Sequence, residues 1–256
     1  FCDSVLGALG VTELAEGTAI LDQLSELTGV PVPAPLAALK DKPVRFRETV
    51  TRDHMVDQVL EMLRLMALFA IGDTHLSLSS NKPMDVFGGG WEGYVDKLRA
   101  GFTAVGPEDT VVLCGDLSWG MSLEEAREDF AFLDALPGGR KILLKGNHDY
   151  WWNTAAKMNR FFAENGFSTL QILHNNCYEY GDYALCGTRG WFYEETGDQK
   201  VFKRELIRLE ASLKAAGERP KLCFLHYPPL YQGYSCPQII ALLEQYGVQR
   251  CYYGHL

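Results

Sequence analysis

Short, continuous apolar runs alternate with amphipathic segments from Met66 to the end of the chain. Continuous apolar runs of this length are typical of strands that are buried on both faces. We therefore expect strands at 66–72, 110–114, 140–145, 169–173, 183–187, 221–226 and 249–253. The amphipathic segments predict helices at 91–104, 122–136, 153–165, 200–216 and 236–246. This alternation of strands and helices predicts an α/β fold with a largely parallel core.

Residues 1–65 follow a different pattern. Thr12 is placed to cap a helix that continues to Leu27, with Gly29 as its stop, and the PVPAP segment at 31–35 is typical of a linker. A second amphipathic helix is expected at about 51–64. This part of the chain carries no evident catalytic motif. The sequence thus predicts a helical N-terminal extension of unknown role at 1–65 and an α/β domain at 66–256.

Polar residues with catalytic or ligating side chains follow five of the predicted strands. They include four of the six histidines of the chain, which random scatter would rarely produce. Ligands of α/β sheets bind outside the carboxyl ends of the strands, so these side chains are expected to gather at one edge. The set consists of Asp73, His75, Asp116, Asn147, His148, His226 and His255.

Carboxylate, imidazole and amide ligands without cysteine suit divalent ions such as manganese, iron or zinc. The two oxygens of Asp116 could bridge two such ions. A pair of ions about 3.5–4 Å apart can hold a phosphoryl group and lower the pKa of a shared water, which then attacks phosphorus. The residue types therefore predict two divalent metal ions and phosphoester hydrolysis.

Composition and charge indicate which class of ligand the protein binds and where it is located. A formal net charge of -9 and a pI near 5.2 disfavour a duplex nucleic acid, so we expect a small phosphorylated substrate instead. The longest apolar run, LMALFAI at 65–71, is too short to span a bilayer, and no signal peptide is visible. The seven cysteines form no CxxC pair and lie mostly in apolar runs. Buried, reduced thiols of this kind predict a cytoplasmic protein.

The motifs DTH, GDLSWG, GNHD, HYPP and GHL occur in this order between residues 66 and 256. This ordered set resembles the calcineurin-like metallophosphoesterase superfamily, and GNHDYWW, GTRGW and YGHL look closest to a bacterial subgroup of predicted phosphohydrolases. The resemblance implies a four-layer α/β/β/α sandwich of two mixed sheets. Nothing in the periodicity of the sequence shows the second sheet.

The resemblance also implies roles for individual residues. Asp73 and His75 match ligands of a first metal ion, and Asp116 matches the carboxylate that bridges both ions. The ligands of the second ion correspond to Asn147, His226 and His255. His148 matches a catalytic residue that is not a ligand; as an imidazolium it would stabilise phosphoryl charge and protonate the leaving oxygen.

This sequence departs from the family pattern in several places. Many relatives have GDxxD, in which the second carboxylate orients the catalytic histidine, whereas Trp119 stands at that position here. Asp149 is a candidate for the missing support. The chain stops at Leu256, inside the GHxH motif, and starts with Phe1. From this pattern we expect a C-terminally truncated domain that lacks at least one late strand, behind an added or foreign helical segment.

Other residues allow two interpretations. Arg189 could bind a substrate phosphate or form a structural ion pair, and His174 fits no motif and is expected to be a loop histidine. The tryptophans at 151, 152 and 191 could line the cleft or belong to the core. For the whole protein, the alternatives to a metallophosphoesterase are a non-catalytic binding or regulatory domain and, less favoured by the acidity, a nuclease.

Overall fold

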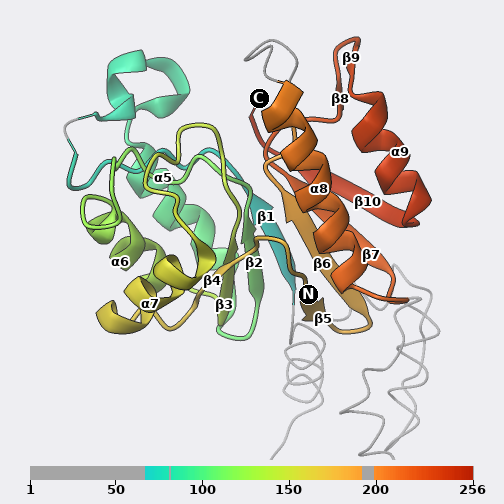
Figure 1. Ribbon diagram of the computed structural model, residues 1–256. Helices are drawn as coiled ribbons and strands as arrows, with labels where there is room; N and C mark the ends of the chain where they lie inside the picture. The colour runs from blue at the N-terminus through green and yellow to red at the C-terminus, as the bar shows by residue number, and fades with distance from the viewer. Residues whose placement is uncertain (1–66, 81, 192–198, 256) are drawn as a thin grey trace, which may run out of the picture. The chain divides into compact units, whose positions relative to one another are not determined.

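A computed structural model describes residues 67–80, 82–191 and 199–255 of the 256-residue chain (Figure 1). These residues form a mixed α/β fold with one parallel sheet, one mixed sheet and a short hairpin. The helical extension expected at 1–65, with its linker and both helices, lies outside the described residues, as do Met66 and Leu256. That part of the domain prediction stays a prediction.

The first sheet has the strand order β1-β2-β3-β4, and all of its described pairings are parallel. The pairing aligns the last residues of β1, β2 and β3, so that Ile71, Leu113 and Leu143 are neighbours across the sheet. The loops that follow these strands therefore leave the sheet at the same edge. The strands are β1 (Leu68–Ile71), β2 (Thr110–Leu113), β3 (Arg140–Leu143) and β4 (Leu170–Ile172).

The second sheet has the order β10-β7-β6-β5 and is mixed, because β5 runs antiparallel to β6. Its parallel strands end in register, with Thr188 beside Leu225 and Leu225 beside Tyr253. The strands are β5 (Tyr178–Tyr180), β6 (Tyr183–Thr188), β7 (Lys221–Leu225) and β10 (Val248–Tyr253), and a hairpin of β8 (Leu230–Tyr231) and β9 (Tyr234–Ser235) stands apart.

Helices cover the outer side of each sheet (Figure 1). The helices beside the first sheet are α5 (Tyr94–Gly101), α6 (Arg127–Ala135) and α7 (Ala155–Asn165), with short 3₁₀ segments at Met84–Phe87, Gly89–Trp91 and Phe102–Ala104. Those beside the second sheet are α8 (Gln199–Ala215) and α9 (Pro237–Gln245). Each of the five α-helices within the described residues falls within or close to a segment that the sequence predicted.

Two helix boundaries differ from the prediction. The helix expected at 122–136 begins only at Arg127. The Ser122 hydroxyl accepts from the Glu125 N–H and the Glu125 carboxylate accepts from the Met121 N–H, so these residues stabilise a turn before the helix rather than its first turn. The segment expected as one helix at 91–104 is interrupted because Gly93 is left-handed, with φ of 62°.

Both faces of the central strands β2 and β3 are buried, which explains their continuous apolar runs, whereas β1 is partly exposed. Val111 and Leu143 belong to a cluster that includes residues of the outer helices. Their strand neighbours Val112 and Ile142 point the other way and share a cluster with Phe224 of the second sheet. Successive side chains of a strand point to opposite faces of the sheet. One face of the first sheet therefore packs on the outer helices, and the other face packs on the second sheet.

The described cysteines are all free thiols, and four of the six are buried. Within the ranges 67–80, 82–191 and 199–255, no helix combines the length and apolarity that crossing a bilayer requires.

Candidate metal centre

The loops that follow five parallel strands carry the polar residues expected to form a site. Asp73 and His75 follow β1, Asp116 follows β2, and Asn147 and His148 follow β3. From the second sheet, His226 follows β7 and His255 follows β10. Hydrogen bonds join the loops: Asp73 N–H donates to the carbonyl of Gly115 at 2.9 Å, and His75 N–H donates to that of Asp116 at 2.9 Å.

Four of these residues have left-handed backbone conformations. The φ angles are 59° at Asp73, 43° at His75, 55° at Asp116 and 58° at His255. Non-glycine residues rarely adopt such angles, and each costs roughly 1–3 kcal/mol that the surrounding structure must offset. Strain of this kind concentrates at functional sites, and four of the six non-glycine residues with positive φ in the described ranges belong to the motifs.

Glycines next to these residues allow the loops to approach each other closely. A Cβ atom built on Gly146 would lie 2.1 Å from Oδ1 of Asp116, and one on Gly115 would lie 2.8 Å from Nδ1 of His226. A Cβ on Gly254 would lie 2.7 Å from Oδ2 of Asp73. The glycines of the GD, GN and GH motifs are therefore needed for the ligating atoms to reach one place.

The ligating atoms of Asp73, Asp116, His226 and His255 all lie within 4.8 Å of one another. His75 belongs to the same cluster, because its Nε2 lies 3.9 Å from Oδ1 of Asp73 and 3.7 Å from Oδ2 of Asp116. Ligand atoms that share one ion about 2.0–2.2 Å away lie roughly 3–4 Å apart. The spacing in this cluster therefore fits a metal ion.

The protonation states also fit a metal ion. His226 is completely buried, and its Nδ1 lies 2.9 Å from the carbonyl oxygen of Cys114, which can only accept a hydrogen bond. Nδ1 therefore carries the proton, and Nε2 presents a lone pair to the side-chain oxygen of Asn147 at 2.7 Å. Two facing lone pairs at this distance are unfavourable unless a cation, or the NH₂ group of a turned Asn147 amide, lies between them.

Burial keeps the imidazoles of the cluster neutral. It lowers the pKa of His226 to about 3 and that of His75 to about 4, and neighbouring histidines add to both shifts. Burial raises the pKa of Asp73, while the N–H of His255, 2.8 Å from its Oδ2, lowers it. A neutral imidazole is the form that binds a metal.

His148 lies at the rim of this cluster. Its backbone N–H donates to Oδ1 of Asp116 at 2.8 Å, which leaves the Oδ2 atom of Asp116 facing the histidine ligands. Its ring centre is 4.7 Å from that of Trp119. The ring Nδ1 lies 3.2 Å from the hydroxyl of Tyr150. Sequence reasoning missed Tyr150, although it follows the motif closely.

Asp149 is completely buried and shapes the loop that carries Asp116. Its Oδ2 accepts from the N–H groups of Asp116 at 2.9 Å and Gly146 at 2.7 Å. Its Oδ1 accepts from Leu117 N–H at 2.8 Å and Trp151 Nε1–H at 3.0 Å, with a longer contact of 3.4 Å to Ser118 N–H. The carboxylate thereby joins the loops after β2 and β3. The support for His148 that the sequence suggested stays a prediction.

Arg189 lies beside the cluster rather than in it. Its carbonyl accepts from the N–H groups of His226 at 3.1 Å and Tyr227 at 2.8 Å, which ties it to the metal centre through the backbone. Its guanidinium Nη2 lies 3.6 Å from Oε1 of the buried Glu205. The ion-pair alternative for Arg189 is therefore present, and its contact with a phosphate stays a prediction.

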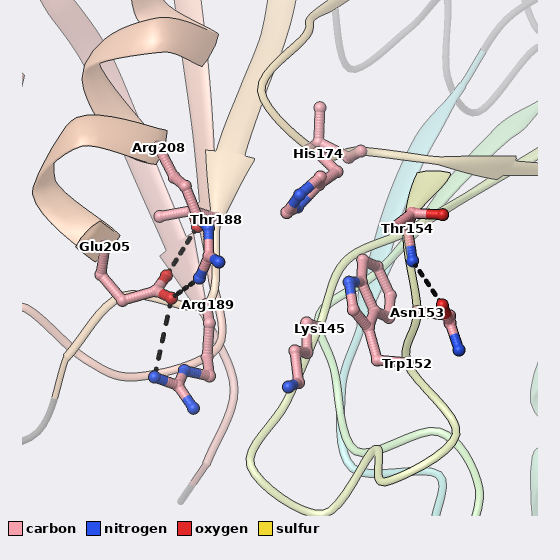
Figure 2. A pocket seen from close by; sticks show the side chains of 10 residues that line it. Lys145, Trp152, Asn153, Thr154, His174, Thr188, Arg189, Glu205 and Arg208 are labelled. Carbon is pink, nitrogen blue, oxygen red and sulfur yellow. Dashed lines mark hydrogen bonds and ion pairs between the residues drawn. The ribbon is translucent and has the colours of Figure 1, made fainter. Parts of the chain in front are cut away.

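A cavity of about 220 Å³ opens next to Arg189 (Figure 2). Sequence reasoning missed it, because its walls come from loops and a helix face that no motif connects. Trp151 and Trp191 are core residues, and Trp152 packs partly against the core while it also lines the cavity. His174 lies in the loop after β4, as expected, and lines the cavity as well. The lining residues are Lys145, Trp152, Asn153, Thr154, Leu173, His174, Thr188, Arg189, Glu205 and Arg208.

Comparison with known proteins identifies the family. The family model described as calcineurin-like phosphoesterase matches residues 66–256, the part of the chain that carries all of these residues. The chain belongs to the calcineurin-like phosphoesterase family. Membership suggests metal-dependent phosphoester hydrolysis, and the cluster of aspartates and histidines could hold the metal.

A solved structure similar to this calcineurin-like phosphoesterase is that of AQ665, a protein of unknown function from Aquifex aeolicus. It is 18% identical, has a TM-score of 0.42, and the match covers 73% of this chain and 88% of that one. No curated protein matched the sequence.

Proposed function

We propose that this chain is a phosphoester hydrolase that works with two divalent metal ions of the manganese, iron or zinc type. The observation that carries the proposal is the convergence of Asp73, Asp116, His226 and His255, whose ligating atoms lie within 4.8 Å of one another. These residues are up to 182 positions apart in sequence, as the hydrogen bond from His255 N–H to Asp73 illustrates. Membership of the family supports the same activity.

The position of Asp116 supports a bridging role between two ions. Its Oδ2 lies 3.7 Å from Nε2 of His75, a proposed ligand of the first ion, and 3.6 Å from Nε2 of His226, a proposed ligand of the second. In the proposal, Asp73 and His75 hold the first ion. Asn147, His226 and His255 hold the second, and the carboxylate of Asp116 belongs to both.

The residues around the ions have separate tasks. The ions would polarise the phosphoryl oxygens and lower the pKa of a water that attacks phosphorus. His148, at the rim, would donate a proton to the leaving oxygen, and Arg189 would bind a phosphate oxygen of a small phosphorylated substrate.

Tyr150 and Asp149 would position these groups. The hydroxyl of Tyr150, 3.2 Å from Nδ1 of His148, would hold the imidazole in the place where relatives use a carboxylate. Asp149 would keep the Asp116 loop in its strained conformation through backbone hydrogen bonds.

We also infer the four-layer α/β/β/α arrangement of this family for the domain. The apolar cluster shared by Val112, Ile142, Leu185 and Phe224 supports it, because these residues come from both sheets. The helices on the outer sides would supply the first and fourth layers (Figure 1).

The test combines metal analysis with turnover. The purified chain is loaded with manganese, iron or zinc, its metal content is measured, and hydrolysis of an aryl phosphate monoester and an aryl phosphate diester is followed. We expect two metal equivalents per chain and hydrolysis of at least one ester. Asp116→Asn should lose metal and activity together, whereas His148→Ala should keep the metal and lose about 10²- to 10⁴-fold in turnover.

Asp134→Asn is a matched control, because this carboxylate bonds to Thr169 far from the cluster. Full activity in both site variants would refute the mechanism. One metal equivalent or none, with tight binding of a phosphorylated ligand and no turnover, would instead favour a binding or regulatory domain. Cleavage of single-stranded DNA in preference to both aryl esters would favour a nuclease.

A further inference from the structure

The cavity beside the metal centre has an excess of positive charge. Lys145, Arg189 and Arg208 line it, and Glu205 is the one carboxylate among its described lining residues. This is unexpected in a chain whose formal net charge is -9. Figure 2 shows Lys145 and Trp152 on one wall, with Arg189, Glu205 and Arg208 on the wall opposite.

Glu205 is already engaged by several partners. It is 2% exposed, its Oε1 pairs with both Arg208 Nη1 and Arg189 Nη2, and its Oε2 accepts from the Thr188 hydroxyl at 2.9 Å. One carboxylate therefore balances only one of the two guanidinium charges. The Arg189 side chain is 17% exposed and that of Arg208 is 37% exposed, so the excess charge is partly removed from water and an anionic ligand in this cavity would be stabilised.

Three donor groups at the cavity have no hydrogen-bond partner among the described residues. The ammonium of Lys145 makes no ion pair or hydrogen bond within the described ranges. The buried Nε of Arg189 and Nε1 of Trp152 likewise lack a hydrogen-bond partner in the described structure.

Two backbone segments connect residues that line the cavity to residues of the metal centre. Lys145 precedes Gly146 and Asn147 in the loop after β3, and the carbonyl of Arg189 accepts from His226 N–H. A second cavity, of about 420 Å³, lies on the Asp73 side, but Lys97 is the one cation among its lining residues and donates to the Gly90 carbonyl at 3.0 Å. The positive excess thus belongs to the first cavity.

We propose that the cavity lined by Lys145, Arg189 and Arg208 binds a second phosphate of the substrate. The inference rests on the proposed function, because the first phosphate would lie at the metal centre. Guanidinium groups match phosphate oxygens in pairs, and a lysine adds a point charge. The substrate class is therefore a phosphoester that carries another phosphate on the same small molecule.

The test uses alkanediyl bisphosphonates, which are not hydrolysed, with spacers of different lengths. Their inhibition constants are compared with those of alkylphosphonates of equal carbon number, with the aryl ester that the enzyme turns over as substrate and free divalent metal held constant. At one spacer length the bisphosphonate should bind at least about tenfold more tightly, as expected for one additional charge-assisted contact. Lys145→Gln and Arg208→Gln should each remove most of this advantage.

Matched controls lie close by. Arg204 is one turn from Arg208 on α8 but exposed, and Lys157 is exposed on α7; neither lines the cavity. Arg204→Gln and Lys157→Gln should keep the preference for the bisphosphonate. Turnover with equal inhibition by both compound classes at every spacer length would overturn the inference and leave the proposed function standing.

If no ester is hydrolysed, the proposed function fails and the cavity is tested by itself. Calorimetric titration of the metal-free chain with pyrophosphate then decides. Binding that Lys145→Gln and Arg208→Gln weaken about tenfold, but Arg204→Gln does not, would support the anion site. Absence of binding, or equal binding by all variants, would overturn it.

Discussion

Replacement of Asp149 by asparagine tests how the strained metal loop is held. The two oxygens of the buried carboxylate accept from Asp116 N–H and Gly146 N–H on one side, and from Leu117 N–H and Trp151 Nε1–H on the other. An amide presents an oxygen on one side only. In either orientation, the NH₂ group of the asparagine faces at least two N–H donors, which then have no acceptor.

Each buried donor left without an acceptor costs about 1–3 kcal/mol, so Asp149→Asn should lower the free energy of unfolding by about 2–6 kcal/mol. Because the displaced loop carries the bridging carboxylate of Asp116, metal affinity should also fall, by about 10- to 100-fold. Urea unfolding of the metal-free chain measures the first effect and metal titration the second.

Asp134→Asn makes the same chemical change without the same loss. Thr169 donates both its N–H, at 2.9 Å, and its hydroxyl, at 2.6 Å, to Oδ1 of Asp134. An amide oxygen can accept both bonds, and the buried ammonium of Lys141 loses the nearby charge but keeps its carbonyl and hydroxyl acceptors, so this variant should lose less stability than Asp149→Asn. An Asp149→Asn variant as stable as Asp134→Asn would refute the reasoning.

Three further predictions follow from the site. Tyr150→Phe removes the hydroxyl 3.2 Å from Nδ1 of His148 and should lower kcat about 2- to 10-fold with KM unchanged. Steady-state kinetics that match the wild type would argue against a positioning role for Tyr150. Gly146→Ala places a Cβ 2.1 Å from Oδ1 of Asp116, so the variant should lose metal binding. Metal analysis measures this loss, and full metal occupancy in the variant would contradict the packing argument. Burial holds the pKa of His226 at about 3, against 6.5 when unfolded, so the unfolded chain binds a proton first as the pH falls. The metal-free protein should therefore lose about 1.4 kcal/mol per pH unit from this histidine below pH 6.5; urea midpoints that stay constant between pH 7 and 5 would count against it.

The positions of most strands could be predicted from local sequence, because burial on both faces leaves a continuous apolar run. The short strands at 178–180, 230–231 and 234–235 could not, since the polar and aromatic residues of the YEY segment leave no such run. Periodicity also gave no sign that the strands divide between two sheets. Strand pairing depends on contacts between distant residues, which a local pattern does not contain.

The sequence by itself determined which residue types follow the strands and, through their order, the family of the chain. Only the tertiary structure decided how they meet: that His226 of the second sheet reaches the Cys114 carbonyl of the first, and that Asp149 holds the Asp116 loop. It also brought Lys145 and Arg208 to one cavity. The physical reason is that a motif records a side chain and its local turn, whereas distances between loops follow from sheet register and the packing of one sheet on the other.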